Sequence, residues 1–220
     1  MASTFENGND RRCNLATDIE PNGSGLSRRL IYKKLGPTDR GLIEDHLLRL
    51  DTTDRQMRFC SRVSDRAIRS YCERIEWSKT TALGCFMDRR LRGMAELVHA
   101  PIPISNNAEV ALTVEGPMQN QGIGSELLRK TLVLARNRYI PSVYMFCLFE
   151  NARMWHIARK FEASLLFKEG EVEGRIWPPW PSLLSLTEEA TADYHALFCA
   201  SLETIVLVTT HSVSPSSEKK

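Results

Sequence analysis

A strand-like stretch that runs into a glycine-bearing turn and then into a helical pattern constrains this chain more than any other feature. Residues 109–115 alternate as Glu-Val-Ala-Leu-Thr-Val-Glu, and residues 119–125 read Gln-Asn-Gln-Gly-Ile-Gly-Ser before apolar residues at helical spacing. A helix that begins just after a strand presents unpaired backbone N–H groups and the positive end of its dipole at one point. Glycines there let an anion approach closely. We therefore expect an anion cradle that suits a pyrophosphate.

Other glycine-bearing turns explain these residues less well. An ordinary tight turn also uses glycine to relieve strain, so the turn alone does not decide. A Walker-type loop ends in Gly-Lys-Ser/Thr, whereas here Gly124 is followed directly by Ser125, with no lysine between them. A dinucleotide-binding turn has a third glycine where this chain has Leu127. The residues therefore disfavour a kinase-like NTPase and a dinucleotide-binding fold.

The turn resembles the coenzyme A loop of the GNAT superfamily of N-acyltransferases. That loop reads Gln/Arg-x-x-Gly-x-Gly/Ala after a strand, and Gln119, Gly122 and Gly124 match its three fixed positions. The resemblance extends over roughly residues 28–179, because the elements on both sides of the loop come in that family's order. It implies one α/β domain with a mixed central sheet of about seven strands, helices on both faces, and a fourth and fifth strand that are parallel and splayed.

Hydrophobic periodicity gives the individual elements in the order β-α-α-β-β-β-α-β-α-β-β. The predicted strands are 28–35, 81–87, 93–99, 109–115, 142–149, 163–168 and 174–177. The predicted helices are 38–50, 64–77, 123–138 and 151–161.

The resemblance also implies a set of cofactor-binding residues. The pantetheine arm of acetyl-CoA would pair with the backbone of Leu112, Thr113 and Val114, as an added strand would. The asparagine that contacts coenzyme A in the family corresponds to Asn151, which is equally suited to cap a helix. The pyrophosphate would be held by the loop residues Asn120, Gln121, Gly122, Ile123, Gly124 and Ser125.

Transfer to an amine also requires a neutral nucleophile. A lysine with a pKa of about 10.4 costs roughly 4 to 5 kcal/mol to deprotonate at pH 7, so a base near the cleft is expected. The resemblance places that base at Glu109, and Glu96 on the neighbouring strand is the alternative. Glu115 shares the strand parity of Glu109 but lies about 20 Å away along an ideal strand, so the two cannot form a carboxylate pair.

The chain departs from the family pattern in the helix 151–161. The tyrosine that often protonates the leaving thiolate is replaced by Ala158, and Glu162-Ala163 stands where Gly-Phe is usual. His156 lies about 200° around the helix from Ala158, so we do not expect it to substitute. A thiol with a pKa near 8.5 still leaves tolerably without an acid.

Composition limits the remaining choices. The 220 residues are 42% hydrophobic and carry a net charge of +2, which suits one core and demands no polyanion. The six cysteines form no C-x-x-C pair, so they indicate reduced thiols rather than zinc or a disulfide framework. No signal peptide and no apolar run of membrane-spanning length is present. We expect a cytoplasmic protein with neither a metal nor a membrane partner.

The two ends differ from the centre. Residues 1–27 are polar and lack periodicity, which predicts a flexible tail before a domain of residues 28–180. Residues 181–220 form an extension outside the resemblance. In it we expect a helix over 187–202, a β-prone run at 205–208 and a disordered end.

Three functions remain open at this stage. The first is an acetyl-CoA-dependent N-acyltransferase that acts on an amine of a small molecule or a protein. In this chain, the start of the strand at 109–115 and the start of the helix at 151–161 weakly resemble those of bacterial protein-lysine acetyltransferases. The second is a non-catalytic acyl-CoA-binding regulator, which Ala158 motivates. The third is nucleic-acid binding, which rests only on the arginines between residues 55 and 92 and which the charge does not favour. A homodimer is compatible with each.

Overall fold

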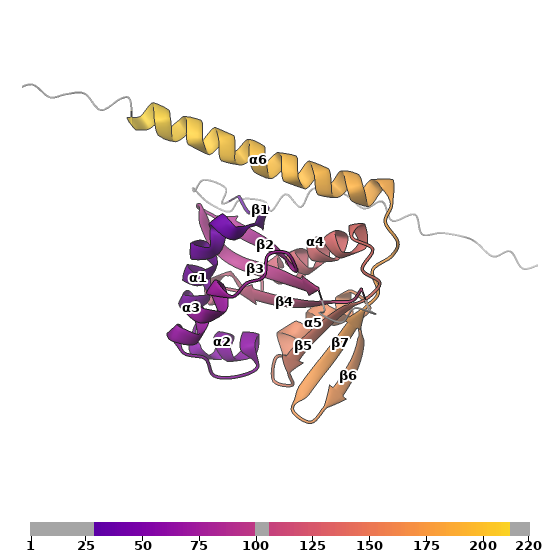
Figure 1. The fold of residues 1–220 in the computed structure, drawn as a ribbon. Helices are drawn as coiled ribbons and strands as arrows, with labels where there is room; N and C mark the ends of the chain where they lie inside the picture. The colour runs from indigo at the N-terminus through magenta and orange to yellow at the C-terminus, as the bar shows by residue number, and fades with distance from the viewer. Residues whose placement is uncertain (1–28, 100–105, 212–220) are drawn as a thin grey trace, which may run out of the picture.

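The computed structural model describes residues 29–99 and 106–211. Seven strands form one mixed sheet in the order β1-β2-β3-β4-β5-β7-β6, in which β4 and β5 are parallel and all other neighbours antiparallel. This confirms the predicted α/β sheet (Figure 1). The strands are β1 Ile31–Leu35, β2 Thr80–Met87, β3 Arg90–His99, β4 Ala108–Val114, β5 Val143–Leu148, β6 Ser164–Lys168 and β7 Glu171–Ile176.

Six helices and two short 3-10 turns complete the described part of the chain. Four of the helices, α1, α3, α4 and α5, correspond to the predicted ones. The helices are α1 Arg40–Arg49, α2 Thr52–Phe59, α3 Asp65–Glu73, α4 Ile123–Asn137, α5 Ala152–Lys160 and α6 Leu183–His211, and the 3-10 turns are η1 Pro37–Asp39 and η2 Gly116–Met118.

Helix α2 was not predicted from the sequence. It has no buried residue, so it lacks the apolar stripe on which periodicity depends. Its local signal is a cap, because the side chain of Asp51 accepts a hydrogen bond from Asp54 N at 2.7 Å. A helix of this kind is recognisable from its first turn rather than from its core face.

Helix α6 corrects the prediction for the C-terminal extension. The chain is helical from Leu183 to His211, including residues 205–208, where a β-prone run was expected. Ser182 and Ser185 cap the start reciprocally, each backbone N–H donating to the other's hydroxyl. Once a helix is nucleated, each further residue adds a hydrogen bond, and this outweighs weak β propensity. The predicted tail 1–27 and the end beyond residue 211 lie outside the described residues.

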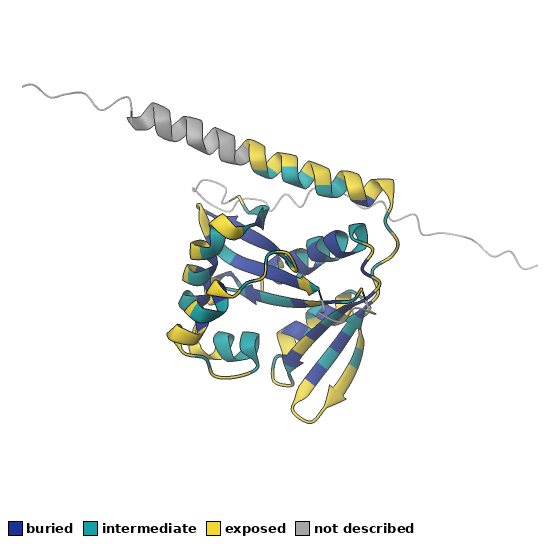
Figure 2. Cartoon of the chain, viewed as in Figure 1, coloured by how far each residue is buried: buried dark blue, intermediate teal, exposed yellow. Residues whose placement is uncertain are grey.

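The helices pack on both faces of the sheet. On one face, Ile43 and Leu47 of α1 and Ile68 of α3 form a buried cluster with β1, β2 and β3. On the other face, α4 and α5 bury their apolar sides against the strands, for example Leu128 of α4 and Met154 of α5. Figure 2 shows the buried residues concentrated in the strands between these layers. None of the described helices is both long enough and apolar enough to cross a membrane.

Strands β4 and β5 separate soon after they meet. Only Ala108 and Glu109 of β4 have partners in β5, namely Val143 and Tyr144. At this end the strands are held together, because Ala108 N donates to Ser142 O at 3.2 Å and Ser142 Oγ donates to Asn107 Oδ1 at 2.6 Å. The rest of β4 has no β5 partner, which confirms the predicted splay.

A buried carboxylate ties α1 to the end of β4. Glu115 receives hydrogen bonds from Arg49 Nε at 2.7 Å and Arg92 Nη1 at 2.8 Å. His46 Nδ1 lies 3.5 Å from Glu115 Oε1, at the limit of a hydrogen bond, and His46 Nε2 is 2.8 Å from Thr113 Oγ1. Burial raises the pKa of Glu115, but the hydrogen bonds from His46, Arg92 and Arg49 outweigh burial and bring that pKa down to about 2.

We expect Glu115→Gln to lower the free energy of unfolding by about 2 to 4 kcal/mol at pH 7, because the substitution leaves two partly buried arginines, Arg49 and Arg92, without their anion. The folded-state pKa of Glu115 lies below its unfolded value of about 4.3, so this stabilisation is present above that pH and is lost as the pH falls towards 2. Denaturant unfolding between pH 7 and pH 3 should show the wild type and the variant converging.

The control is Glu44→Gln, which removes an exposed partner of Arg69. It should cost less than about 1 kcal/mol. A gap between wild type and Glu115→Gln that stays constant down to pH 3 would contradict the account.

Candidate functional site

The turn between β4 and α4 has the geometry of an anion cradle. Gly122 adopts a left-handed conformation, with φ of +80°, and the neighbouring Asn120 has φ of +60°. Glu126 N donates to Gly122 O, which is the first hydrogen bond of α4. The amide groups of residues 123–125 precede it and have no earlier helical carbonyl to bind. These N–H groups and the helix dipole face the same end of the cleft described below.

Gly124 is required for a different reason from Gly122. A Cβ atom built on Gly124 would lie 3.0 Å from Ile157 Cδ1 of α5, whereas nothing lies within 4 Å of a Cβ on Gly122. Gly124 therefore allows α4 and α5 to approach each other, and Gly122 supplies the positive φ of the turn.

The splay leaves alternate backbone groups of β4 facing an open gap. Ala108 N donates a hydrogen bond on the β5 side of the strand, and Glu115 N donates to Arg92 O of β3. Backbone groups alternate in direction along a strand, so those of even-numbered β4 residues point to the gap and those of odd-numbered residues point to β3. Leu112 and Val114 thus turn their backbone towards the gap. Thr113, predicted to do the same, faces β3 with its backbone, and its hydroxyl bonds His46 instead.

The gap opens into a cleft of about 460 Å³ lined by the glycine loop, β4, α5 and the unpredicted helix α2. Eight of the ten predicted cofactor-binding residues line it: Leu112, Thr113, Val114, Asn120, Gly122, Gly124, Ser125 and Asn151. The other two do not, because Ile123 is buried against the sheet and the Gln121 side chain donates to Pro117 O. Sequence analysis missed the lining residues of α2, namely Asp54, Met57 and Arg58.

Asp54 links three walls of the cleft. Its Oδ2 accepts a hydrogen bond from Gln119 Nε2 at 2.8 Å, and its Oδ1 lies 3.2 Å from Arg153 Nη2 of α5. Gln119 also donates to Val114 O at 2.9 Å, so this first fixed position of the loop motif satisfies a carbonyl at the end of β4. Burial, followed by the charge of Asp51, raises the pKa of Asp54. The carboxylate thus anchors both the loop and the mouth of the cleft.

Helix α5 supplies the opposite wall. Asn151 caps it, its Oδ1 accepting from Met154 N at 3.2 Å, and the same residue lines the cleft. Arg153, His156 and Lys160 also line the cleft, so His156 is a wall residue that the sequence analysis had set aside. Ala158 is fully buried in the core. The position at which the resemblance implies a tyrosine is therefore occupied by a packing residue.

The candidate bases lie in different environments. Glu96 is buried, and its Oε2 accepts from Arg58 and, at 2.9 Å, from the Tyr71 hydroxyl. Glu109 is exposed and is the last β4 residue with a partner in β5, which places it at the vertex of the gap. Side chains alternate between the two faces along a strand, so the side chain of Glu109 lies on the same face of the sheet as that of Thr113. This is the face that α1 and α3 cover. Glu109 is not among the residues that line the cleft.

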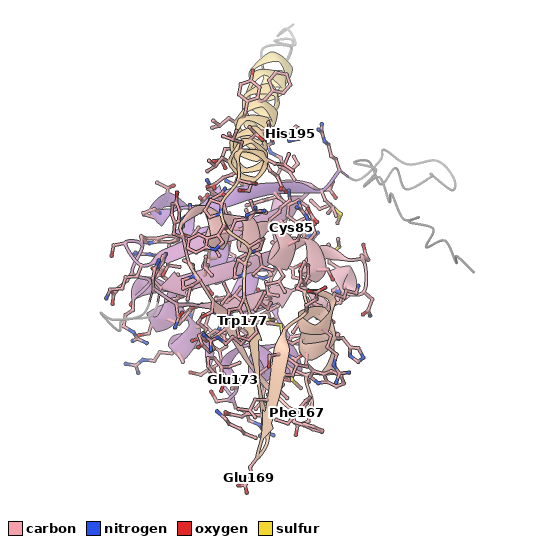
Figure 3. All side chains as sticks on the ribbon, turned by 90° about the vertical axis from the view of Figure 1, so that its right-hand side faces the viewer. Cys85, Phe167, Glu169, Glu173, Trp177 and His195 are labelled. Atoms are coloured by element: carbon pink, nitrogen blue, oxygen red, sulfur yellow. The ribbon has the colours of Figure 1, made fainter. Side chains whose placement is uncertain are left out.

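The sheet beyond the gap is open on this same face. Tyr144 and Phe146 of β5 stack with ring centroids 6.3 Å apart, and Arg175 of β7 lies over the rings of Tyr144 and Trp177. The β6–β7 hairpin projects from the body with Glu169 at its tip and Phe167 and Glu173 along it (Figure 3). An extended surface of aromatic and charged groups therefore adjoins Glu109.

Neither a metal site nor a reactive thiol is evident in the part of the chain that the structure describes. No group of three or more His, Cys, Asp or Glu residues there could hold a metal ion. Cys60, Cys72, Cys85 and Cys147 are free. Burial raises the pKa of Cys147 to about 11, so this thiol acts as a small core residue rather than as a nucleophile.

Comparison with known proteins identifies the fold. No protein-family model matches the sequence, and no curated protein matches it. The GNAT domain of S. lividans PAT superposes with a TM-score of 0.57 at 18% identity, covering 66% of this chain and 89% of that one. PaiA N-acetyltransferase from Thermoplasma acidophilum, in complex with coenzyme A, gives 0.52 at 17% identity over 68% and 99%. YncA from Salmonella typhimurium, with its cofactor acetyl-CoA, gives 0.53 at 11% identity over 70% and 96%.

Proposed function

With the GNAT fold as the premise, we propose that this protein transfers an acetyl group from acetyl-CoA to a primary amine, which attacks the thioester directly. The observation that carries the proposal is the gap beside β4, which ends at the glycine loop and opens into one cleft. Two proteins of the same fold were solved with coenzyme A or acetyl-CoA. The cleft of this chain offers the groups that such a molecule needs.

Acetyl-CoA would bind mainly through the backbone. The pantetheine amides would pair with the backbone of Leu112 and with the N–H of Val114, because the Val114 carbonyl already accepts from Gln119. The pyrophosphate would accept hydrogen bonds from the amides of residues 120–125. Asn151 would contact the pantetheine from the opposite wall. Arg153 and Lys160 lie on that wall and would add positive charge near the phosphates.

The amine would approach from the other face of the sheet. Glu109 lies at the vertex of the gap on the face of α1 and α3, opposite α4 and α5. Its exposed carboxylate can take a proton from an incoming ammonium group through water. Glu96 serves a different role, because its Oε2 is occupied by Arg58 and Tyr71.

The reaction balances without a metal or a redox partner. The neutral amine attacks the thioester carbon, and a backbone N–H of β4 that faces the gap stabilises the developing oxyanion. The attacking nitrogen loses a proton to solvent, and the carbon–sulfur bond then breaks. The thiolate takes a proton from solvent, because Ala158 supplies none and is buried in the core. The products are the acetylated amine and coenzyme A.

A non-catalytic acyl-CoA-binding regulator is the second candidate, and the burial of Ala158 favours it. Calorimetry with acetyl-CoA, run beside a thiol-release assay over a panel of small amines and lysine peptides, separates the two. The enzyme predicts both binding and release of coenzyme A in the presence of an acceptor. Binding without turnover for any amine would support the regulator, and absence of binding would contradict both.

For the cofactor loop, we expect Gly122→Asp to weaken acetyl-CoA binding about 100-fold relative to Gly122→Asn. Both side chains tolerate the left-handed conformation and meet no neighbour within 4 Å, so the pair differs mainly in charge. Repulsion of a phosphate by a carboxylate about 4 Å away is worth several kcal/mol at a partly shielded site. Calorimetric affinities that are equal for the two variants would contradict the placement of the pyrophosphate.

For the base, we expect Glu109→Gln to lower kcat about 10² to 10⁴-fold at neutral pH while leaving acetyl-CoA affinity unchanged. The loss should shrink as the pH rises, because more of the acceptor is already neutral. Glu96→Gln is the comparison: it should lower stability by leaving Arg58 without its anion, and it should preserve the shape of the pH profile. Normal turnover of Glu109→Gln at pH 7, with the chemical step rate-limiting, would remove Glu109 as the base.

A further inference from the structure

Helix α6 carries its apolar side chains on the side that faces solvent. Leu183, Leu184, Tyr194 and Phe198 are between 52% and 84% exposed, and together they define what we term the outer stripe. Exposed residues follow the outer side of α6 and partly buried ones the side towards the domain (Figure 2). A surface helix normally turns its apolar stripe to the core, so α6 is reversed.

Polar contacts fix this orientation. Lys34 Nζ lies 2.6 Å from both Glu189 Oε1 and Asp193 Oδ2, and Glu188 pairs with Arg129 of α4. The hydroxyl of Ser185, which is fully buried, donates to Asn137 Oδ1 at 2.6 Å. Burial lowers the pKa of Lys34, but its hydrogen bonds to Asp193 and Glu189 outweigh burial and raise that pKa. Turning the outer stripe inward would break these contacts and bury the charges.

The outer stripe carries no charge of its own. Glu188, Glu189 and Asp193 are the only acidic residues between 183 and 198, and all three pair with the domain. The outer side is completed by Thr187, Ala190 and Thr191, which are exposed and uncharged. Two copies of this surface can therefore face each other without like-charge repulsion.

The helix is also long enough to form an interface. Its 29 residues span about 43 Å. Its C-terminal half extends beyond β1 and the rest of the sheet (Figure 1), and the sequence stays apolar there, with Ile-Val-Leu-Val at 205–208. An exposed apolar surface such as the outer stripe is typical of protein–protein contact sites.

The charge pattern argues against a lipid surface as the occupant. Helices that lie on membranes present lysine and arginine beside their apolar face. Between Arg175 and Lys219 the sequence has no lysine or arginine, and the polar side of α6 is acidic. Anionic lipid headgroups would repel such a helix.

We propose that α6 is a dimerisation helix whose outer stripe packs against the outer stripe of a second copy of this chain around a two-fold axis. An apolar, uncharged surface is self-complementary, as an isologous interface requires. Because α6 contacts β1 and α4, whereas the cleft lies between β4, α2 and α5, the second copy leaves the cleft open. Dimerisation is therefore independent of the proposed enzymatic function.

The test is the mass of the full-length chain in solution, measured by analytical ultracentrifugation between about 1 and 100 μM, a range that covers moderate affinities. We expect twice the mass of one 25.0 kDa chain for the wild type. Tyr194→Glu combined with Phe198→Glu should weaken association about 100-fold or more, because like charges would meet across the axis. Tyr194→Lys combined with Phe198→Lys should weaken association to the same extent. Agreement between the two double variants would show that the loss of association does not depend on the sign of the introduced charge.

The matched control is Leu166→Glu on β6, where an apolar side chain of 53% exposure resembles Phe198 at 52%. It should remain dimeric, and circular dichroism should show that all variants keep the wild-type fold. A monomeric wild type at 100 μM would overturn the proposal and assign the stripe to another partner. A dimer that survives both double substitutions would overturn it too, since the contact would then lie elsewhere.

Discussion

The separation of two parallel strands is the constraint on which the rest of the structure depends. Strands β4 and β5 are held together at Ala108 and Ser142 and lose their pairing after Glu109. An unpaired strand in a protein interior normally leaves backbone groups without hydrogen bonds, at a cost of a few kcal/mol. Here the gap opens into a cleft. The Val114 carbonyl is satisfied by Gln119, while the backbone of Leu112 and the N–H of Val114 remain available for a ligand that has amides of its own.

Side-chain contacts hold the gap in shape at the end where the strands are apart. Glu115 joins α1 to the end of β4 through Arg49 and Arg92, and Asp54 joins α2 to Gln119 of the loop. These two carboxylates lie beside the glycine loop, yet each is matched by cationic or amide donors. The site therefore keeps its own anions neutralised by the protein, and the free N–H groups at the start of α4 present a positive potential to an incoming anion.

The sequence predicted the order of the elements along the chain, the loop and eight of the residues that line the cleft, because these rest on short-range patterns. Alternation in β4, the glycines at 122 and 124, and the apolar stripe of α4 are all local signals. Helix α2 has no buried stripe, so its contribution to the cleft was invisible, and the length of α6 was underestimated because its β-branched end suggested a strand. Whether the backbone of Thr113 points to β3 or to the gap, and whether Ala158 packs into the core, depend on how the elements align in the folded sheet. The sequence alone does not give this alignment.

The central claim is that the parted strand and the glycine loop together form an acetyl-CoA site. Amide hydrogen exchange with and without acetyl-CoA tests it most directly, because the proposed contacts are backbone groups. The account predicts slower exchange at Leu112, Val114 and residues 120–125, with little change in α6 or the β6–β7 hairpin. Unchanged exchange at these amides under saturating acetyl-CoA, or protection confined to another part of the chain, would contradict it.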